Sequence, residues 1–189
     1  MDADELITRP KPTWYNNYFF RSKLEAKWAV FFDLMKIKWS YEPEQFTCDD
    51  GSQYTPDFYL PEVFLRDEKR GLYLEIKPSS YRSERTYLDR ITSALKDSQL
   101  VLLVGDPIDA IIDVHLYENH NEQLCPPWDN CMVFMYCNSC HTVKFEFDEG
   151  NYYYCPVCKA GMFGTLPEIS HAAEVARNFR FQFYDPRNK

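Results

Sequence analysis

Two acidic residues and one lysine fall at spacings that suit metal-assisted chemistry. Asp57 lies in the run 54–60, and Glu75 and Lys77 lie two residues apart in the run 72–77. Successive side chains of a strand point to opposite faces, so Glu75 and Lys77 share one face. If the two runs pair as a hairpin, Asp57 comes beside Glu75, and a divalent cation between them relieves their repulsion. Oxygen ligands of this kind suit Mg²⁺ or Mn²⁺.

The same residue types have a simpler interpretation, because Glu and Lys often pair on a solvated sheet face. The order of the residues along consecutive strands favours the metal site. Lys77 beside a metal could orient or deprotonate an attacking water, or stabilise charge on a phosphate. Leu72, Leu74 and Ile76 alternate with this polar set and predict a core face on the other side of the strand.

A helix is predicted from about Arg21 to Lys36, where apolar residues recur at helical spacing. Ser22 and Glu25 form an S-x-x-E capping box at its start. A strand is predicted at 38–42, before the two runs that carry the candidate site.

The remaining elements complete an α/β core. Pro61 is expected to end the run 54–60, and 66–71 to form a hairpin loop. A second helix is predicted at 83–98. The apolar run 100–104 predicts a buried strand reached by a helical crossover. A short helix at 108–112, a strand at 114–117 and a linker at 125–127 are expected beyond it.

Three segments carry the resemblance to a known family: Arg21–Ala29, Tyr54–Phe58 with its Pro-Asp pair, and Leu74–Pro78 with its E-x-K set. Together they resemble the PD-(D/E)xK (restriction-endonuclease-like) nuclease superfamily, over roughly residues 18–107. The resemblance implies an αβββαβ core, with a mixed sheet flanked by helices, and metal-dependent hydrolysis of DNA phosphodiester bonds.

The resemblance also assigns roles to the candidate residues. It implies that Asp57 and Glu75 bind Mg²⁺ (or Mn²⁺), with the Ile76 carbonyl as a further ligand, and that Lys77 assists the attacking water. Glu25 matches an acidic position that completes the metal shell in several branches of the superfamily. Glu25 is equally well explained as a helix cap, and both roles can hold together.

Basic residues of the two predicted helices are candidates for contact with DNA, although most exposed Lys and Arg are simply solvated. The candidates are Arg21, Lys23, Arg82 and Arg85. The net charge of −8 counts modestly against nonspecific nucleic-acid binding. The acidity is concentrated after residue 104, where 6 Lys and Arg face 12 Asp and Glu, a net of −6.

Four of the seven cysteines form two C-x-x-C pairs separated by 14 residues. They are Cys137, Cys140, Cys155 and Cys158. The spacing predicts a Cys₄ zinc site, and four thiolates leave no open position, so the metal is expected to be structural. The residues between the pairs, 142–154, are expected to form a hairpin, as in a zinc ribbon. A redox pair or an iron–sulfur cluster is the alternative.

The remaining cysteines and the composition bear on compartment and partners. Cys125 and Cys131 are expected to be buried, and His141 to be a bystander of the metal. An odd number of cysteines, an acidic N-terminus and no apolar run of eighteen residues predict a cytoplasmic protein without a membrane span.

Three regions are predicted: an N-terminal arm at 1–17, the nuclease core at 18–120, and a zinc-ribbon subdomain with a tail at 121–189. The predicted function is a DNA nuclease, as a homodimer or as a partner in recombination or transposition machinery. The alternative is a nuclease-like module that no longer cleaves and docks a protein or nucleic acid through its ribbon.

Overall fold

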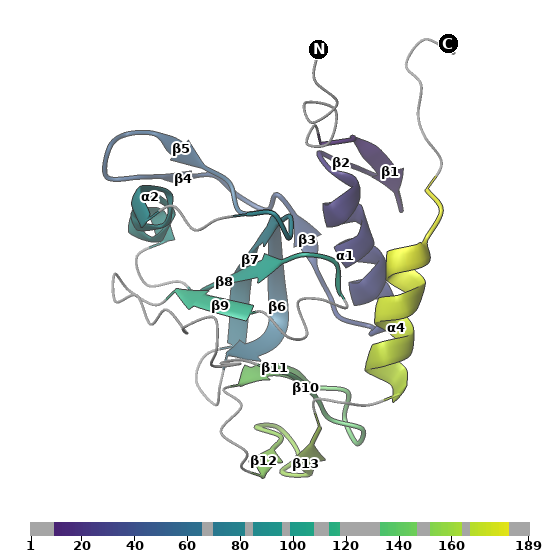
Figure 1. Ribbon diagram of the computed structural model, residues 1–189. Coiled ribbons are helices and arrows are strands. Elements are labelled where there is room, and N and C mark those ends of the chain that lie inside the picture. Colours follow the sequence, from purple (N-terminus) through teal and green to yellow (C-terminus); the bar gives the residue numbers. More distant parts are fainter. Residues whose placement is uncertain are drawn as a thin grey trace.

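The protein is an α/β structure in which helices pack against a mixed β-sheet, as the sequence predicts (Figure 1). The computed structural model describes residues 10–65, 70–81, 85–95, 99–107, 114–117, 133–146, 152–163 and 167–181. No helix in these segments is both long and apolar enough to cross a membrane.

The main sheet has seven strands in the order β10-β11-β6-β7-β8-β9, with β3 on the side of β6. These strands are β3 (Ser40–Tyr41), β6 (Phe58–Leu65), β7 (Arg70–Lys77), β8 (Leu100–Val104), β9 (Val114–Tyr117), β10 (Val133–Tyr136) and β11 (Val143–Glu146). The pairs β6–β7 and β8–β9 are antiparallel, whereas β7–β8 and β11–β6 are parallel. The predicted helical crossover between β7 and β8 is confirmed, because α2 (Arg85–Leu95) lies between these parallel strands in the sequence.

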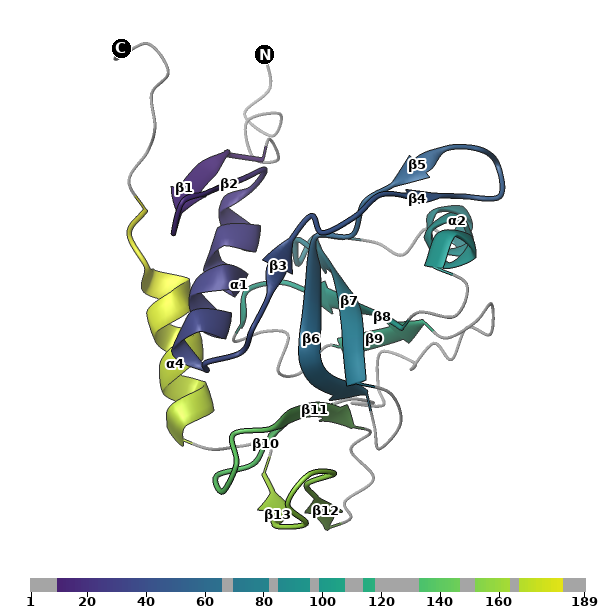
Figure 2. The ribbon, with the colours of Figure 1, turned by 180° about the vertical axis from the view of Figure 1, so that it is seen from behind.

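Helices cover both faces of the sheet. Helix α1 (Lys23–Leu34) and helix α4 (Pro167–Asn178) lie side by side on one face, and α2 lies on the other (Figures 1 and 2). The α1 face holds the larger core cluster, which includes Leu72, Leu74 and Ile76, as their alternation predicts. The smaller cluster under α2 includes Tyr73 and Leu102. Strand β8 is therefore buried on both faces.

Three parts of the chain differ from the prediction. Part of the N-terminal arm is a hairpin, in which β1 (Thr13–Tyr15) pairs with β2 (Tyr18–Phe20). Strand β6 continues through Pro61, because the ladder with β7 shifts register between Leu60 and Phe64 and so tolerates a residue without an N–H. The predicted strand at 38–42 shortens to β3. The segments 108–112 and 125–127 lie outside the described residues.

Part of the cysteine-bearing region belongs to the main sheet. Strand β11 pairs with β6 in parallel, and α4 packs on α1. The predicted boundary at 120/121 lies outside the described residues. Elements on the two sides of this boundary share one sheet and one core cluster.

Candidate active site and metal centre

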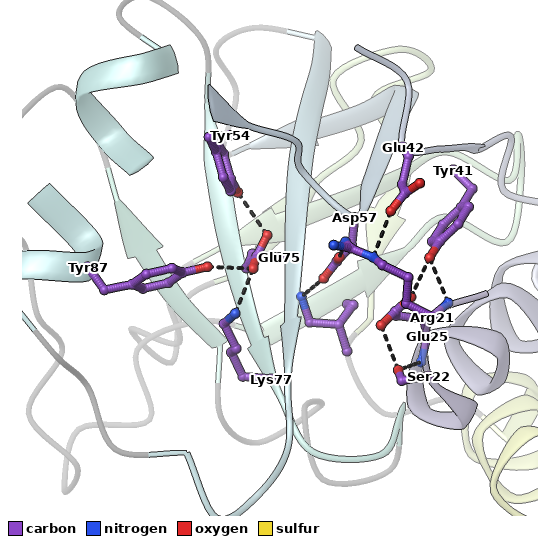
Figure 3. A network of polar contacts seen from close by, with 11 residues as sticks. Arg21, Ser22, Glu25, Tyr41, Glu42, Tyr54, Asp57, Glu75, Lys77 and Tyr87 are labelled. Carbon is purple, nitrogen blue, oxygen red and sulfur yellow. Dashed lines mark hydrogen bonds and ion pairs between the residues drawn. The ribbon is translucent and has the colours of Figure 1, made fainter. Parts of the chain in front are cut away.

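Three buried carboxylates lie at one end of β6, β7 and α1 (Figure 3). Phe58 pairs with Leu74 in the antiparallel ladder, so the preceding Asp57 comes opposite Glu75. Asp57, Glu75 and Glu25 are 4%, 5% and 8% exposed. The hairpin inferred from the sequence therefore brings the predicted residues together.

Asp57 accepts two hydrogen bonds that fix both of its oxygens. The Ile76 N–H donates to Oδ2 at 2.7 Å, and Arg21 Nη2 donates to Oδ1 at 2.6 Å. Burial, with the nearby Glu75 and Glu25 carboxylates, raises the pKa of Asp57 well above its usual value, although Ile76 and Arg21 act in the opposite sense. The protonated form of Asp57 is therefore favoured unless a further positive partner lies beside it.

Glu75 accepts three hydrogen bonds. The Tyr54 hydroxyl donates to Oε2 at 2.8 Å, while the Tyr87 hydroxyl (2.6 Å) and Lys77 Nζ (2.7 Å) both donate to Oε1. Burial and the charge of Glu75 raise the pKa of both tyrosines, so their hydroxyls stay protonated and act as donors. The carboxylate is therefore held in one orientation from two sides.

Lys77 lies between the carboxylate and an aromatic ring. Its Nζ lies 4.6 Å from the centre of the Tyr87 ring, in addition to its contact with Glu75. Gly105 connects the end of this strand to α1 by two hydrogen bonds. Its N–H donates to the Lys77 carbonyl, and its own carbonyl accepts from Trp28 Nε1 on α1. Gly105 has φ of 93°, in the left-handed region that favours glycine.

Glu25 is a helix cap and also a member of the carboxylate group. Ser22 is the N-cap, and its hydroxyl oxygen accepts from the Glu25 N–H at 3.2 Å. The Ser22 hydroxyl donates to Glu25 Oε1, and the Tyr41 hydroxyl donates to Oε2, both at 2.6 Å. The capping role is confirmed, and the metal role stays a prediction, as does that of the Ile76 carbonyl.

Arg21 is the candidate DNA contact that joins the site. Its guanidinium bridges Asp57 and Glu42, with Nε 2.7 Å from Glu42 Oε1, and 56% of its side chain is exposed. Lys23 is exposed at the start of α1. Arg82 and the side chain of Arg85 lie outside the described residues, so their predicted contacts are not tested.

Sequence reasoning missed the residues that surround the carboxylates. Tyr41, Glu42 and Tyr54 lie in or beside predicted strands, and Tyr87 lies in the helix predicted at 83–98. The available signal was the residue type, because a tyrosine on an apolar face carries a hydroxyl that needs a partner when buried.

The carboxylate group is negative as a whole. Four carboxylates (Glu25, Glu42, Asp57 and Glu75) face two cations (Arg21 and Lys77), a net of −2. Among the described residues, only a group of cysteines brings three or more potential ligands close enough to hold a metal as they stand. The carboxylates are instead held by their arginine, lysine and hydroxyl partners.

The four predicted cysteines form this group, and their Sγ atoms all lie within 4.8 Å of one another. The Sγ atoms of Cys137 and Cys158 are 3.5 Å apart, and those of Cys140 and Cys155 are 3.4 Å apart. Tetrahedral zinc with Zn–S bonds of about 2.3 Å places sulfurs about 3.8 Å apart. The cluster therefore fits a structural zinc ion.

Each cysteine pair is the turn of its own hairpin, which corrects the predicted single hairpin between the pairs. The first pair connects β10 to β11, and the second connects β12 (Tyr153–Tyr154) to β13 (Gly161–Met162). In both turns the N–H of the first cysteine donates to the carbonyl five residues on. The residue after the second cysteine has positive φ in both, 60° at His141 and 63° at Lys159.

The surroundings of the cysteines favour metal binding. The Thr142 hydroxyl, 3.0 Å from Cys140 Sγ, lowers the pKa of that thiol to about 6, which favours the thiolate that a metal requires. Although the Ala160 N–H acts in the opposite sense, the other cysteines raise the pKa of Cys158. The His141 ring contacts the Tyr136 hydroxyl through Nδ1 at 2.5 Å and is not part of the ligand group. Cys125 and Cys131 lie outside the described residues.

This chain matches no protein-family model, no curated protein and no solved structure.

Proposed function

We propose that this protein is a metal-dependent nuclease that hydrolyses phosphodiester bonds, with DNA as its substrate. The observation that carries the proposal is the pair of buried carboxylates on adjacent strands, Asp57 and Glu75, with Lys77 bonded to the second. Buried carboxylates are costly unless they are paired or bind a metal. With all four carboxylates ionised the group has a net charge of −2, which matches one divalent cation.

Mg²⁺ is usually held by one or two carboxylates with waters and a substrate phosphate, so Asp57 and Glu75 suffice as protein ligands. When bound, the ion would polarise the phosphate and lower the pKa of a water. Tyr54 and Tyr87 keep Glu75 oriented, and Lys77 orients the attacking water and stabilises charge on the phosphate. Glu25 joins through water, because its oxygens are held by Ser22 and Tyr41.

The proposal is tested by cleavage of linear, nicked and branched DNA with Mg²⁺ or Mn²⁺, using the zinc-loaded wild type, Asp57→Asn and Lys77→Met. Loss of several kcal/mol of transition-state stabilisation predicts a rate lower by about a thousandfold for Asp57→Asn. Glu174→Gln, on the exposed side of α4, is the control and keeps full activity. A folded wild type that cleaves none of these substrates with either ion contradicts the proposal.

A chain with one such site would cut both strands of a duplex as a dimer. Sedimentation of the protein with a short duplex measures this stoichiometry. A partner in recombination or transposition would supply the same arrangement by placing two copies on one DNA.

A second candidate function is the docking of a partner through the cysteine-bearing hairpins. Large apolar side chains are exposed on the second of these, with Tyr152 93%, Tyr154 61% and Phe163 55% exposed. The register of β12 and β13 places these three rings on one face. This function predicts that Tyr152→Ser abolishes partner binding while Asp57→Asn leaves it unchanged, and the nuclease predicts the reverse for cleavage.

A further inference from the structure

A pocket of about 90 Å³ lies at the other end of the sheet, between α1, strands β6 and β7, and the first cysteine turn. A space of this size can hold several waters, or a small oxyanion in their place. The residues that line it and carry the argument are Lys36, Lys38, Glu62, Arg70, His141 and Thr142.

The charge of this pocket is opposite to that of the chain. Three cationic side chains line it, Lys36, Lys38 and Arg70, against the single carboxylate of Glu62, in a protein with a net charge of −8. Lys38 Nζ bonds Glu62 Oε1 at 2.5 Å. This bond, with the charges of Lys38 and Arg70, lowers the pKa of Glu62, so Glu62 stays ionised and orients Lys38. Lys36 and Arg70 remain as a net positive pair.

The backbone adds an independent observation. Lys36 lies two residues after the end of α1 and has φ of 56°. Its N–H donates to Asp33 O, and the Ile37 N–H donates to Phe32 O. This is a helix C-terminal turn that usually has glycine at the left-handed position. Lys36 therefore stands at a position where glycine costs the backbone least, and it lines the pocket. His141 also lines the pocket, and its positive φ belongs to the cysteine turn, as that of Lys159 does in the other turn.

The pocket is separate from the carboxylate group. Arg70 lies five residues before Glu75 on β7, and Glu62 lies five residues after Asp57 on β6. At about 3.3 Å per residue, each strand separates the two places by about 17 Å. An anion in the pocket therefore does not contact the candidate active site.

We propose that this pocket binds a phosphate group, held by Lys36 and Arg70, with residues of the first cysteine turn also lining the space. The Lys36 ammonium and the Arg70 guanidinium both line this small polar space, and two such donors suit a doubly charged tetrahedral oxyanion. The phosphate comes either from a nucleic-acid backbone or from a free phosphate ion, and both share this chemistry. The inference stands apart from the nuclease, because none of the pocket's residues belongs to the carboxylate group.

The test is calorimetric titration of the zinc-loaded protein with inorganic phosphate, for wild type, Lys36→Gln, Arg70→Gln and Lys159→Gln. Lys159 is the matched control, because it is an exposed lysine at positive φ in the second cysteine turn, outside the pocket. Each pocket variant is expected to weaken phosphate binding about fivefold, the effect of one partly exposed charge contact. Lys159→Gln is expected to bind as the wild type does.

A parallel measurement identifies the source. Binding of a short DNA duplex is followed against salt in Ca²⁺, and loss of one backbone contact lowers the slope of log K against log[salt] by about one. A lower slope in Lys36→Gln and Arg70→Gln assigns the pocket to a nucleic-acid phosphate. Weakened phosphate binding with an unchanged DNA slope assigns it to a free phosphate ion. If both measurements are unchanged in both pocket variants, or Lys159→Gln changes them equally, the proposal is wrong.

Discussion

Arg21 occupies the position next to Asp57 that a metal ion would need. Its guanidinium donates to Asp57 Oδ1 at 2.6 Å and is held in place by Glu42 (Figure 3). A divalent cation on Asp57 has to displace this contact. We therefore expect Arg21→Gln to bind Mn²⁺ more tightly than the wild type does.

The size of the effect follows from the exposure of the pair. Two charges about 4 Å apart interact by about 4 kcal/mol at an effective dielectric constant of 20. Water reaches Arg21, whose side chain is 56% exposed, and this screens the pair to about 1 kcal/mol. Arg21→Gln removes this contact of about 1 kcal/mol, which Mn²⁺ otherwise has to displace, so Mn²⁺ should bind about fivefold more tightly. This difference in affinity should decrease as the salt concentration rises.

The assay is electron paramagnetic resonance of free Mn²⁺ titrated with zinc-loaded protein at low salt. Lys23→Gln is the matched control, because it removes one positive charge from the start of the same helix at an exposed position. Glu75→Gln is expected to weaken binding. The reasoning fails if Arg21→Gln binds Mn²⁺ no more tightly than the wild type, or if Lys23→Gln tightens binding by the same factor.

Three further predictions concern stability and the second metal. Burial and the charge of Glu75 raise the pKa of Asp57 in the folded protein above its value in the unfolded chain, about 3.9. Protonated Asp57 therefore stabilises the fold fully below a pH of about 3.9, and this stabilisation is lost as the pH rises through the pKa of the folded protein. Urea unfolding without divalent cations should therefore show Asp57→Asn gaining stability relative to the wild type between pH 5 and pH 8, and a constant difference would contradict this. Phe58 is fully buried among aromatic rings. Phe58→Ala should therefore lower the free energy of unfolding, measured with urea, by about 3–5 kcal/mol, and Phe58→Leu by less than about 1.5 kcal/mol. Equal losses in the two variants would count against the packing argument. Cys137→Ser should abolish stoichiometric zinc by metal analysis and lose hydrogen-exchange protection in β10–β13, whereas Cys48→Ser, at a buried cysteine outside the cluster, should keep both.

Local sequence signals sufficed wherever the partners are close along the chain. The capping pair Ser22 and Glu25 lies within one helical turn, and the alternation in 72–77 places Glu75 and Lys77 on one face. The C-x-x-C spacing predicts the group of four cysteines, whose Sγ atoms lie within 4.8 Å of one another. Such features depend on helical or strand periodicity, which a short run of residues determines by itself.

The end of β6 and the pairing of the cysteine hairpins could not be predicted, because they depend on which strands pair. Periodicity does not specify these partners. Pro61 signals a strand end in isolation, but a register shift against β7 accommodates it. The strands on both sides of each cysteine turn pair with each other across that turn. The alternation of apolar residues does not say which strand a given strand pairs with.

The sequence by itself determined the candidate set: Asp57 and the E-x-K strand, the capped helix that carries Glu25, and four cysteines whose spacing suits one zinc ion. Only the tertiary structure decided what surrounds them. Tyr54 reaches Glu75 from 21 residues away and Arg21 reaches Asp57 from 36 residues away. These contacts depend on how the sheet and α1 pack, and packing brings together residues that no local pattern relates. The same packing places Lys36 and Arg70 around one pocket, in a chain whose overall charge gives no indication of it.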